Sequence, residues 1–211
     1  GVLPLGTGNS FARDLGIVAD VDTACKVVAG EFAAQVDLGE INDQVFVNVA
    51  SMGLTARIAK QLTKDTKRKF GRFVYAIAIA RSIREVRPFK VQLETNNGSR
   101  EFDSMLAVIG TGKYHAGPFP LSPEASITNG KLTFYALTSR NRADFVRYAL
   151  ALPTGNQGNL ENVYTEQCEF GKMVTTPVQK VVVDGEVNMQ SPLSFKVLPG
   201  AIQVMVPEDF E

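Results

Sequence analysis

Residues 181–186, VVVDGE, place two carboxylates on either side of a glycine, directly after an apolar run. Such a run predicts a buried strand, and the glycine predicts a turn that holds Asp184 and Glu186 at the edge of a sheet. In that place one carboxylate can accept a proton from a hydroxyl, while the other holds a divalent cation. Asp-Gly is also a favoured two-residue hairpin turn, so a purely structural role is the alternative.

A second candidate site lies in residues 1–14, GVLPLGTGNSFARD. Residues 2–5 predict the end of a buried strand, and residues 11–15 predict a helix with Asn9 or Ser10 as its N-cap. A glycine turn between a strand and a helix N-terminus exposes backbone N–H groups that can hold a phosphate. The turn has neither the lysine of a phosphate loop nor the spacing of a dinucleotide fingerprint, so a simple connecting turn is the alternative.

The single histidine, His115, lies in a glycine-rich loop, residues 110–118, GTGKYHAGP. One histidine excludes a histidine metal cluster, and the chain has no GxSxG elbow for a serine nucleophile. We interpret His115 as a polar loop residue, with a substrate contact as the alternative. The two cysteines, Cys25 and Cys168, are isolated and lack the spacing of a zinc site.

The chain has no net charge, but its basic residues are concentrated in one block. From Arg57 to Lys90, eleven lysines and arginines stand against Asp65 and Glu85, which gives a net charge of +9. Such a block suggests an anionic partner. Residues 67–86 predict a helix with one apolar face and arginines elsewhere. We expect this segment to dock on an anionic bilayer, and a solvated helix surface is the alternative.

The predicted secondary structure that must position these residues changes near residue 35. Residues 1–34 combine a strand, the glycine turn and two helices, the second of which begins at Asp20 or Asp22 and ends at Gly30. Short strands separated by turns follow, which favours a β-sandwich or an open barrel. We predict strands at residues 36–41, 45–49, 89–94, 100–102, 105–110, 131–137, 178–183, 193–197 and 202–206, with one helix at 142–152.

The order and spacing of these motifs resemble the diacylglycerol kinase-like lipid kinases, whose second motif is close to PLGTGNDFAR. The bacterial soluble branch is the closer likeness. Further agreement lies in Asp37-Leu38-Gly39, FVNVASMG at 46–53, Gly71 with Tyr75, the glycine loop at 110–117, Asn129-Gly130-Lys131-Leu132 and Asp184-Gly185-Glu186.

The resemblance implies an α+β fold. The remnant of an N-terminal α/β nucleotide-binding lobe, residues 1–35, is followed by a mostly antiparallel β-sandwich domain with a few helices, residues 36–211. ATP would lie in the cleft between the lobes. The site residues that the resemblance implies are Gly6, Thr7, Gly8 and Asn9 for the nucleotide, Asp184 as the base for a lipid hydroxyl, and Glu186 for catalytic Mg²⁺.

Three departures from the family pattern qualify these assignments. The family's phosphate-binding motif, GGDGT, would stand before the position of Gly1 and is absent from residues 1–211, so we expect these residues to be a fragment that is inactive alone. Ser10 stands where the family usually has Asp. Asn129 replaces the Asp of a structural Mg²⁺ site in the second lobe. Backbone carbonyls near Ser126 and Lys131 remain, and we expect that site to be weakened or empty.

The resulting hypothesis is an ATP- and Mg²⁺-dependent lipid kinase that phosphorylates a free hydroxyl on diacylglycerol or a similar lipid. A kinase of a soluble substrate, similar to NAD kinases, and a non-catalytic lipid- or membrane-binding domain are the alternatives. The basic block favours a lipid at a membrane, and the retained Asp184 and Glu186 argue against binding alone. We expect a cytoplasmic protein that associates peripherally with an anionic membrane surface, without a nucleic acid partner. The sequence leaves open whether the protein forms a homodimer.

Overall fold

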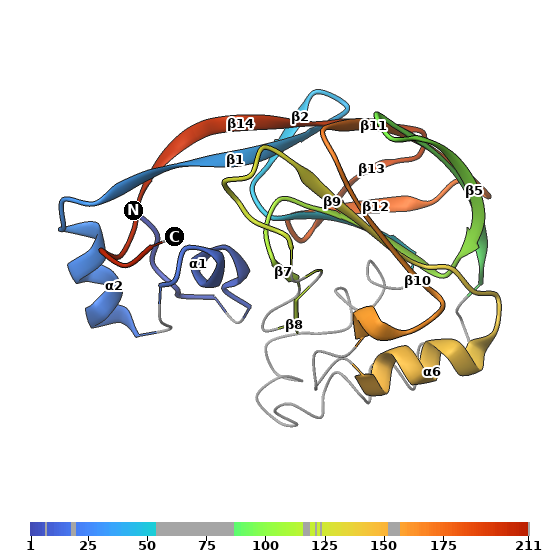
Figure 1. The fold of residues 1–211 in the computed structure, drawn as a ribbon, viewed down its shortest axis with the longest axis horizontal. Helices are drawn as coiled ribbons and strands as arrows, with labels where there is room; N and C mark the ends of the chain where they lie inside the picture. The colour runs from blue at the N-terminus through green and yellow to red at the C-terminus, as the bar shows by residue number, and fades with distance from the viewer. Residues whose placement is uncertain are drawn as a thin grey trace.

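A computed structural model of the chain describes residues 1–6, 8–17, 20–53, 87–115, 119–120, 122, 124–151 and 157–210. Two six-stranded antiparallel sheets form a β-sandwich, and two short helices lie beside one end of it (Figure 1). The fold class that we predict, a short α/β part followed by a β-sandwich, is therefore confirmed. Within the described residues, no helix is long and apolar enough to cross a membrane.

The first sheet has the strand order β2-β1-β14-β11-β4-β5, and all its neighbouring strands are antiparallel. Its strands are β1 (Ala33–Ile41), β2 (Gln44–Phe46), β4 (Phe89–Thr95), β5 (Gly98–Ser104), β11 (Phe170–Thr176) and β14 (Leu193–Met205). Alternating burial along β4 and β11 shows that one face of this sheet packs inward and the other faces solvent.

The second sheet has the strand order β10-β9-β6-β3-β12-β13. Its strands are β3 (Val49–Gly53), β6 (Leu106–Gly110), β9 (Leu132–Leu137), β10 (Val163–Cys168), β12 (Lys180–Val183) and β13 (Glu186–Gln190). A small hairpin joins β7 (Tyr114–His115) to β8 (Phe119–Pro120), and a 3-10 helix, η2, spans Gln157–Asn159.

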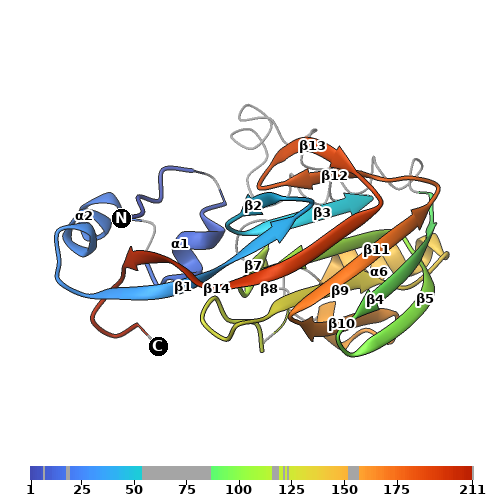
Figure 2. The same ribbon diagram turned by 90° about the horizontal axis from the view of Figure 1, so that it is seen from above.

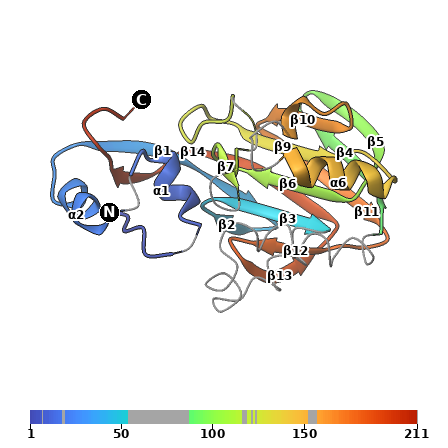
Figure 3. The same cartoon turned by 90° about the horizontal axis from the view of Figure 1, so that it is seen from below.

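The main core fills the space between the two sheets and contains Phe46, Ile109 and Phe134, all at most 1% exposed. Helix α6 (Arg142–Ala151) covers the other face of the second sheet, where Phe145 and Tyr148 pack against residues of β6 and β9 (Figure 3). Strands β6 and β9 are thus buried on both faces, which explains their continuous apolar sequences.

Strands β1 and β14 form a long ribbon that extends beyond the sandwich toward α1 (Ser10–Asp14) and α2 (Val21–Val28) (Figure 2). A second, smaller core holds the helices to this ribbon. It contains Leu15, Ala24, Val36 and Val204 among others, so residues near the C-terminus pack in one core with the two N-terminal helices. The domain boundary that we predict near residue 35 falls within β1 and stays a prediction.

Several predicted elements differ from the observed ones. Residues 2–5 form no strand, because none of the described residues pairs with them. Residues 49–53 leave the hairpin of β1 and β2 and enter the second sheet as β3. The two strands predicted at 193–206 are one strand, which pairs with β1 on both sides of a register shift. Strands β10, β11 and β13 were not predicted, and the helix predicted at 67–86 lies outside the described residues.

Candidate functional site

Asp184 and Gly185 form the two-residue turn between β12 and β13, in which Val183 pairs with Glu186. Both turn residues have positive φ, 46° at Asp184 and 97° at Gly185. Asp-Gly suits this backbone because glycine has no Cβ and aspartate tolerates the left-handed region. The hairpin interpretation of this motif is therefore right for the backbone, and the role of the carboxylate depends on its surroundings.

The Asp184 carboxylate is held by three backbone N–H groups from the connection between β2 and β3. Val47 N donates to Oδ2 at 2.7 Å, while Asn48 N and Val49 N donate to Oδ1 at 3.0 and 2.9 Å. The backbone N–H of Asp184 returns a bond to the Val49 carbonyl at 2.9 Å. A carboxylate offers about four acceptor positions, so three are used and one on Oδ2 takes no hydrogen bond from the described residues. Asp184 as a whole residue is exposed.

Glu186 begins β13 and is exposed, two residues from Asp184. Within the described residues, no group of three or more His, Cys, Asp or Glu side chains could hold a metal ion. Mg²⁺ in kinases is commonly held by one or two carboxylates together with the phosphates of its nucleotide. Glu186 offers one carboxylate of that kind and belongs to no all-protein cage within the described residues.

The predicted nucleotide turn is closed by Asn9. Its Oδ1 accepts from Gly6 N at 2.8 Å, and its Nδ2 donates to the Pro4 carbonyl at 3.0 Å. Asn9 is the N-cap residue of α1, with φ 49°, but its side chain turns back to the loop and does not cap the helix. A Cβ at Gly6 would lie 2.8 Å from Asn9 Oδ1, so a side chain there would push the Asn9 amide out of its place. Thr7 lies outside the described residues.

The segment after β6 connects these two regions. Thr111 Oγ1 donates to the Val47 carbonyl at 2.6 Å, and Thr111 N donates to the Asn48 carbonyl at 3.1 Å. Two and three residues further on, Lys113 N and Tyr114 N donate to Asp14 Oδ1 on α1, at 2.7 and 3.2 Å. Nothing is described of the His115 side chain, so its predicted role stays a prediction.

The loop of the predicted second Mg²⁺ site is closed by hydrogen bonds within the protein. Asn129 Oδ1 accepts from Lys131 N at 3.1 Å, and the Ser126 hydroxyl lies 3.0 Å from that of Thr128. Asp37 is 3% exposed and accepts from Gly130 N at 2.7 Å and from Gly200 N at 2.9 Å. This donor set fits Mg²⁺ poorly, because residue 129 offers a neutral amide that the turn already uses.

Mg²⁺ without nucleotide is expected to leave the melting temperature of the protein unchanged, as is its removal with a chelator. Asn129→Asp supplies a carboxylate at the same turn position, so its melting temperature is expected to rise when Mg²⁺ is added. Thermal unfolding followed by circular dichroism measures both. A Mg²⁺-dependent rise in the wild-type protein that Asn129→Ala removes would contradict the expectation.

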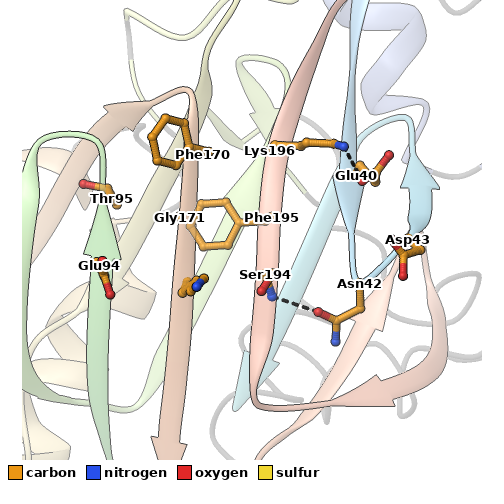
Figure 4. Close-up of a pocket in the computed structure, with 11 residues that line it drawn as sticks. Glu40, Asn42, Asp43, Glu94, Thr95, Phe170, Gly171, Ser194, Phe195 and Lys196 are labelled. Atoms are coloured by element: carbon orange, nitrogen blue, oxygen red, sulfur yellow. Dashed lines mark hydrogen bonds and ion pairs between the residues drawn. The ribbon is translucent and has the colours of Figure 1, made fainter.

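A shallow depression of about 660 Å³ lies on the first sheet, over β1, β4, β11 and β14 (Figure 4). Its side chains are engaged with each other: Lys196 Nζ lies 2.9 Å from Glu40 Oε1, and Ser194 N donates to Asn42 Oδ1 at 2.8 Å. No predicted site residue lines it. The connection at residues 47–49, with Asp184 on one side and Thr111 on the other, is therefore the better candidate site.

Known proteins share this fold. Residues 48–206 match the family of the YegS C-terminal NAD kinase beta sandwich-like domain, and residues 1–41 match the diacylglycerol kinase catalytic domain. The chain therefore belongs to the family of diacylglycerol kinase and YegS-like lipid kinases.

Two relatives are slightly more than a quarter identical to this chain in sequence. A diacylglycerol kinase from Bacillus subtilis (strain 168) is 27% identical over 99% of this chain and 69% of its own length. A probable lipid kinase, YegS-like, from Enterobacter sp. (strain 638) is 28% identical with the same coverage. The chain spans about two thirds of the length of these two relatives.

Solved structures share the fold. The crystal structure of a diacylglycerol kinase from Bacillus anthracis str. Sterne superimposes with a TM-score of 0.72 at 18% identity, over 98% of this chain and 66% of that one. A second crystal structure of a protein from that organism gives a TM-score of 0.80 at 20% identity, over 98% and 67%. At this level of identity the likeness shows the fold alone.

Sequence reasoning missed two residues that hold this region together, Asp14 and Thr111. Asp14 is the last residue of α1, and Thr111 stands between two glycines of the loop after β6. A carboxylate and a hydroxyl beside glycine-rich turns are ordinary surface features in a sequence. Their partners are backbone groups 99 and 64 residues away, and no residue type marks them.

Proposed function

We propose that the chain is part of an ATP-dependent kinase that transfers a phosphoryl group to the hydroxyl of a lipid such as diacylglycerol. The observation that carries the proposal is the exposed Asp184 carboxylate, which three backbone N–H groups hold while one acceptor position of Oδ2 takes no bond from the described residues. The names of the relatives from Bacillus subtilis and Enterobacter support a lipid as the acceptor.

Asp184 acts in this proposal as the general base. Its open Oδ2 position accepts the proton of the lipid hydroxyl while the hydroxyl oxygen forms its bond to phosphorus. Phosphoryl transfer depends mainly on positioning and on neutralising charge, so an oriented carboxylate and an adjacent cation are sufficient parts. Glu186 would hold Mg²⁺, which neutralises phosphate charge, and residues 6–9 would contact the nucleotide.

The direct test is transfer of labelled phosphate from ATP by the full-length protein. Diacylglycerol in detergent micelles and NAD in solution are offered as separate acceptors, because the matched sandwich family also carries the name of NAD kinase. Label in the lipid alone supports the proposal. Label in NAD alone favours the soluble-substrate alternative, and no label in either, with ATP still bound, favours a non-catalytic domain.

We propose further that the basic block, residues 57–90, docks on an anionic membrane. Residues 57–86 lie outside the described part, and Lys90 at its end is paired with Glu101, Nζ to Oε1 at 2.7 Å. Each basic residue near an anionic surface contributes about 1 kcal/mol, so a few of them suffice for reversible binding.

Co-sedimentation of the full-length protein with vesicles measures this docking. Binding to anionic vesicles is expected at low salt, with its loss at high salt and in a variant with Arg68, Lys69 and Arg72 changed to Glu. The matched control changes Lys172, Lys180 and Lys131 to Glu, at exposed positions elsewhere in the sandwich. Equal failure to bind anionic and neutral vesicles would leave residues 57–90 as ordinary surface.

A further inference from the structure

Asp14 is connected to Asp184 through hydrogen bonds and the short backbone segments of two loops. Its Oδ1 accepts from Lys113 N and Tyr114 N. One residue before the intervening Gly112, Thr111 bonds the carbonyls of Val47 and Asn48. The N–H groups of that same connection hold the Asp184 carboxylate. The end of α1 is thus tied to the carboxylate that we propose as the base.

Gly112 lies close to the Asp14 carboxylate. A Cβ at residue 112 would lie 2.4 Å from Asp14 Oδ2 and 2.5 Å from its Cγ, closer than real atoms approach. Oδ2 is buried and has no hydrogen-bond partner within the described residues, whereas Oδ1 accepts two N–H bonds. The loop therefore fits closely around a carboxylate at this place, and a side chain at residue 112 would displace it.

We propose that Asp14 is a positioning residue for the kinase reaction: its carboxyl group seats the loop at residues 112–114 on α1 and thereby sets the position of the connection that holds Asp184. The inference rests on the proposed function for its catalytic meaning. Its structural part, the seating of the loop by a carboxylate, stands on the hydrogen bonds alone. Asp14 touches no reacting atom in this scheme.

The Asp14 carboxyl changes its charge near pH 6, within the range in which activity can be measured. Burial raises the pKa of this carboxyl to about 6, against the smaller lowering effects of the Lys113 and Tyr114 N–H bonds and of the Lys113 ammonium. Lys113 faces Asp14 from the loop, and Arg13 precedes it on α1 and is exposed. Tyr114 and His115 are the other titratable residues of the packed segment. The N–H bonds are stronger to the ionised carboxylate, but the cost of burying its charge is larger, as the raised pKa shows, so the loop is seated less firmly above pH 6.

The folded-state pKa of Asp14 lies above its ordinary value of 3.8, which also fixes the sign of the effect on stability. Between about pH 4 and pH 6 the folded state binds the extra proton, so the contribution of Asp14 to stability falls as pH rises through this window. At neutral pH the ionised carboxylate is therefore a destabilising group. Asp14→Asn is expected to be at least as stable as the wild-type protein at pH 7.5. If Asp14 only stabilised the fold, the substitution would lower the free energy of unfolding instead.

The test measures activity and amide hydrogen exchange of the full-length protein between pH 5 and pH 8. In the wild-type protein the Lys113 and Tyr114 amides are expected to lose protection as pH rises through about 6, because ionisation of the buried carboxyl favours the unseated loop, and kcat is expected to show an inflection with an apparent pKa near 6. Asp14→Asn should lose both pH dependences and lower kcat at pH 7.5 about tenfold to hundredfold, the scale of a small misplacement of catalytic groups. Gly112→Ala, which displaces the carboxylate from the other side, should behave in the same way.

Two controls separate other causes. Asp22→Asn makes the same change at an exposed carboxylate on α2 and should keep the wild-type pH profile. His115→Gln should keep the inflection near pH 6, because an ordinary histidine titrates near pH 6.5 and would otherwise explain it. Wild-type kcat and pH profiles in Asp14→Asn and Gly112→Ala would overturn the inference. Absence of kinase activity in all variants, with the exchange pattern as expected, would overturn the proposed function and leave the seating of the loop intact.

Discussion

Asp184→Asn is expected to lower turnover of the full-length protein by about 10²- to 10⁴-fold, the contribution of general acid–base catalysis. The asparagine suits the positive φ of the turn, so the hairpin of β12 and β13 is retained. An amide cannot accept the proton of a hydroxyl as a carboxylate does. Its NH₂ group also faces one of the N–H groups that now bond Asp184, which is expected to lower stability by about 1–2 kcal/mol.

The matched control for this variant is Asp43→Asn. Asp43 occupies the two-residue turn between β1 and β2, where it also has positive φ, 63°, and is exposed. Steady-state kinetics and thermal unfolding are measured for both variants. Wild-type turnover by Asp184→Asn, with its fold intact, would assign Asp184 to the hairpin alone and would remove the main support for the kinase mechanism.

Gly39→Ala is expected to destabilise the sandwich by about 2–3 kcal/mol, the cost of overpacking a tight core. Gly39 on β1 lies opposite Phe46 on β2, whose ring covers it. A Cβ at Gly39 would lie 2.1 Å from Phe46 Cζ and 2.3 Å from Cε1. Phe46 is 1% exposed and belongs to the main core, so the ring has no free space to move into.

Urea unfolding of Gly39→Ala measures this cost, with Gly158→Ala as the control. Gly158 has no positive φ, and a Cβ added there would meet no atom within 4 Å, so its variant should lie within about 0.5 kcal/mol of the wild-type protein. A similarly small change in Gly39→Ala would show that β2 and its phenylalanine can shift at little cost. The close fit of the Asp37-Leu38-Gly39 segment would then have no role in stability.

The sequence alone determined several local structures of this protein. Asn42-Asp43 and Asp184-Gly185 form the predicted hairpin turns, because positive φ is set by residue type within the turn itself. The helix at residues 142–151 and strands such as β6 and β9 follow from continuous or periodic apolar residues. Motif order was sufficient to indicate the lipid kinase family, since the spacing of several short motifs is specific where each alone is not.

Only the tertiary structure decided which of these pieces meet. Asp184 lies 137 residues from Val47, and Asp14 lies 99 residues from Lys113. In both contacts the donors are backbone N–H groups, which nearly every residue carries, so the sequence holds no mark of the partner. The same holds for Val204, which completes the core around α1 and α2 from the end of the chain. A carboxylate is visible in a sequence, but its orientation depends on loops that the two sheets bring together.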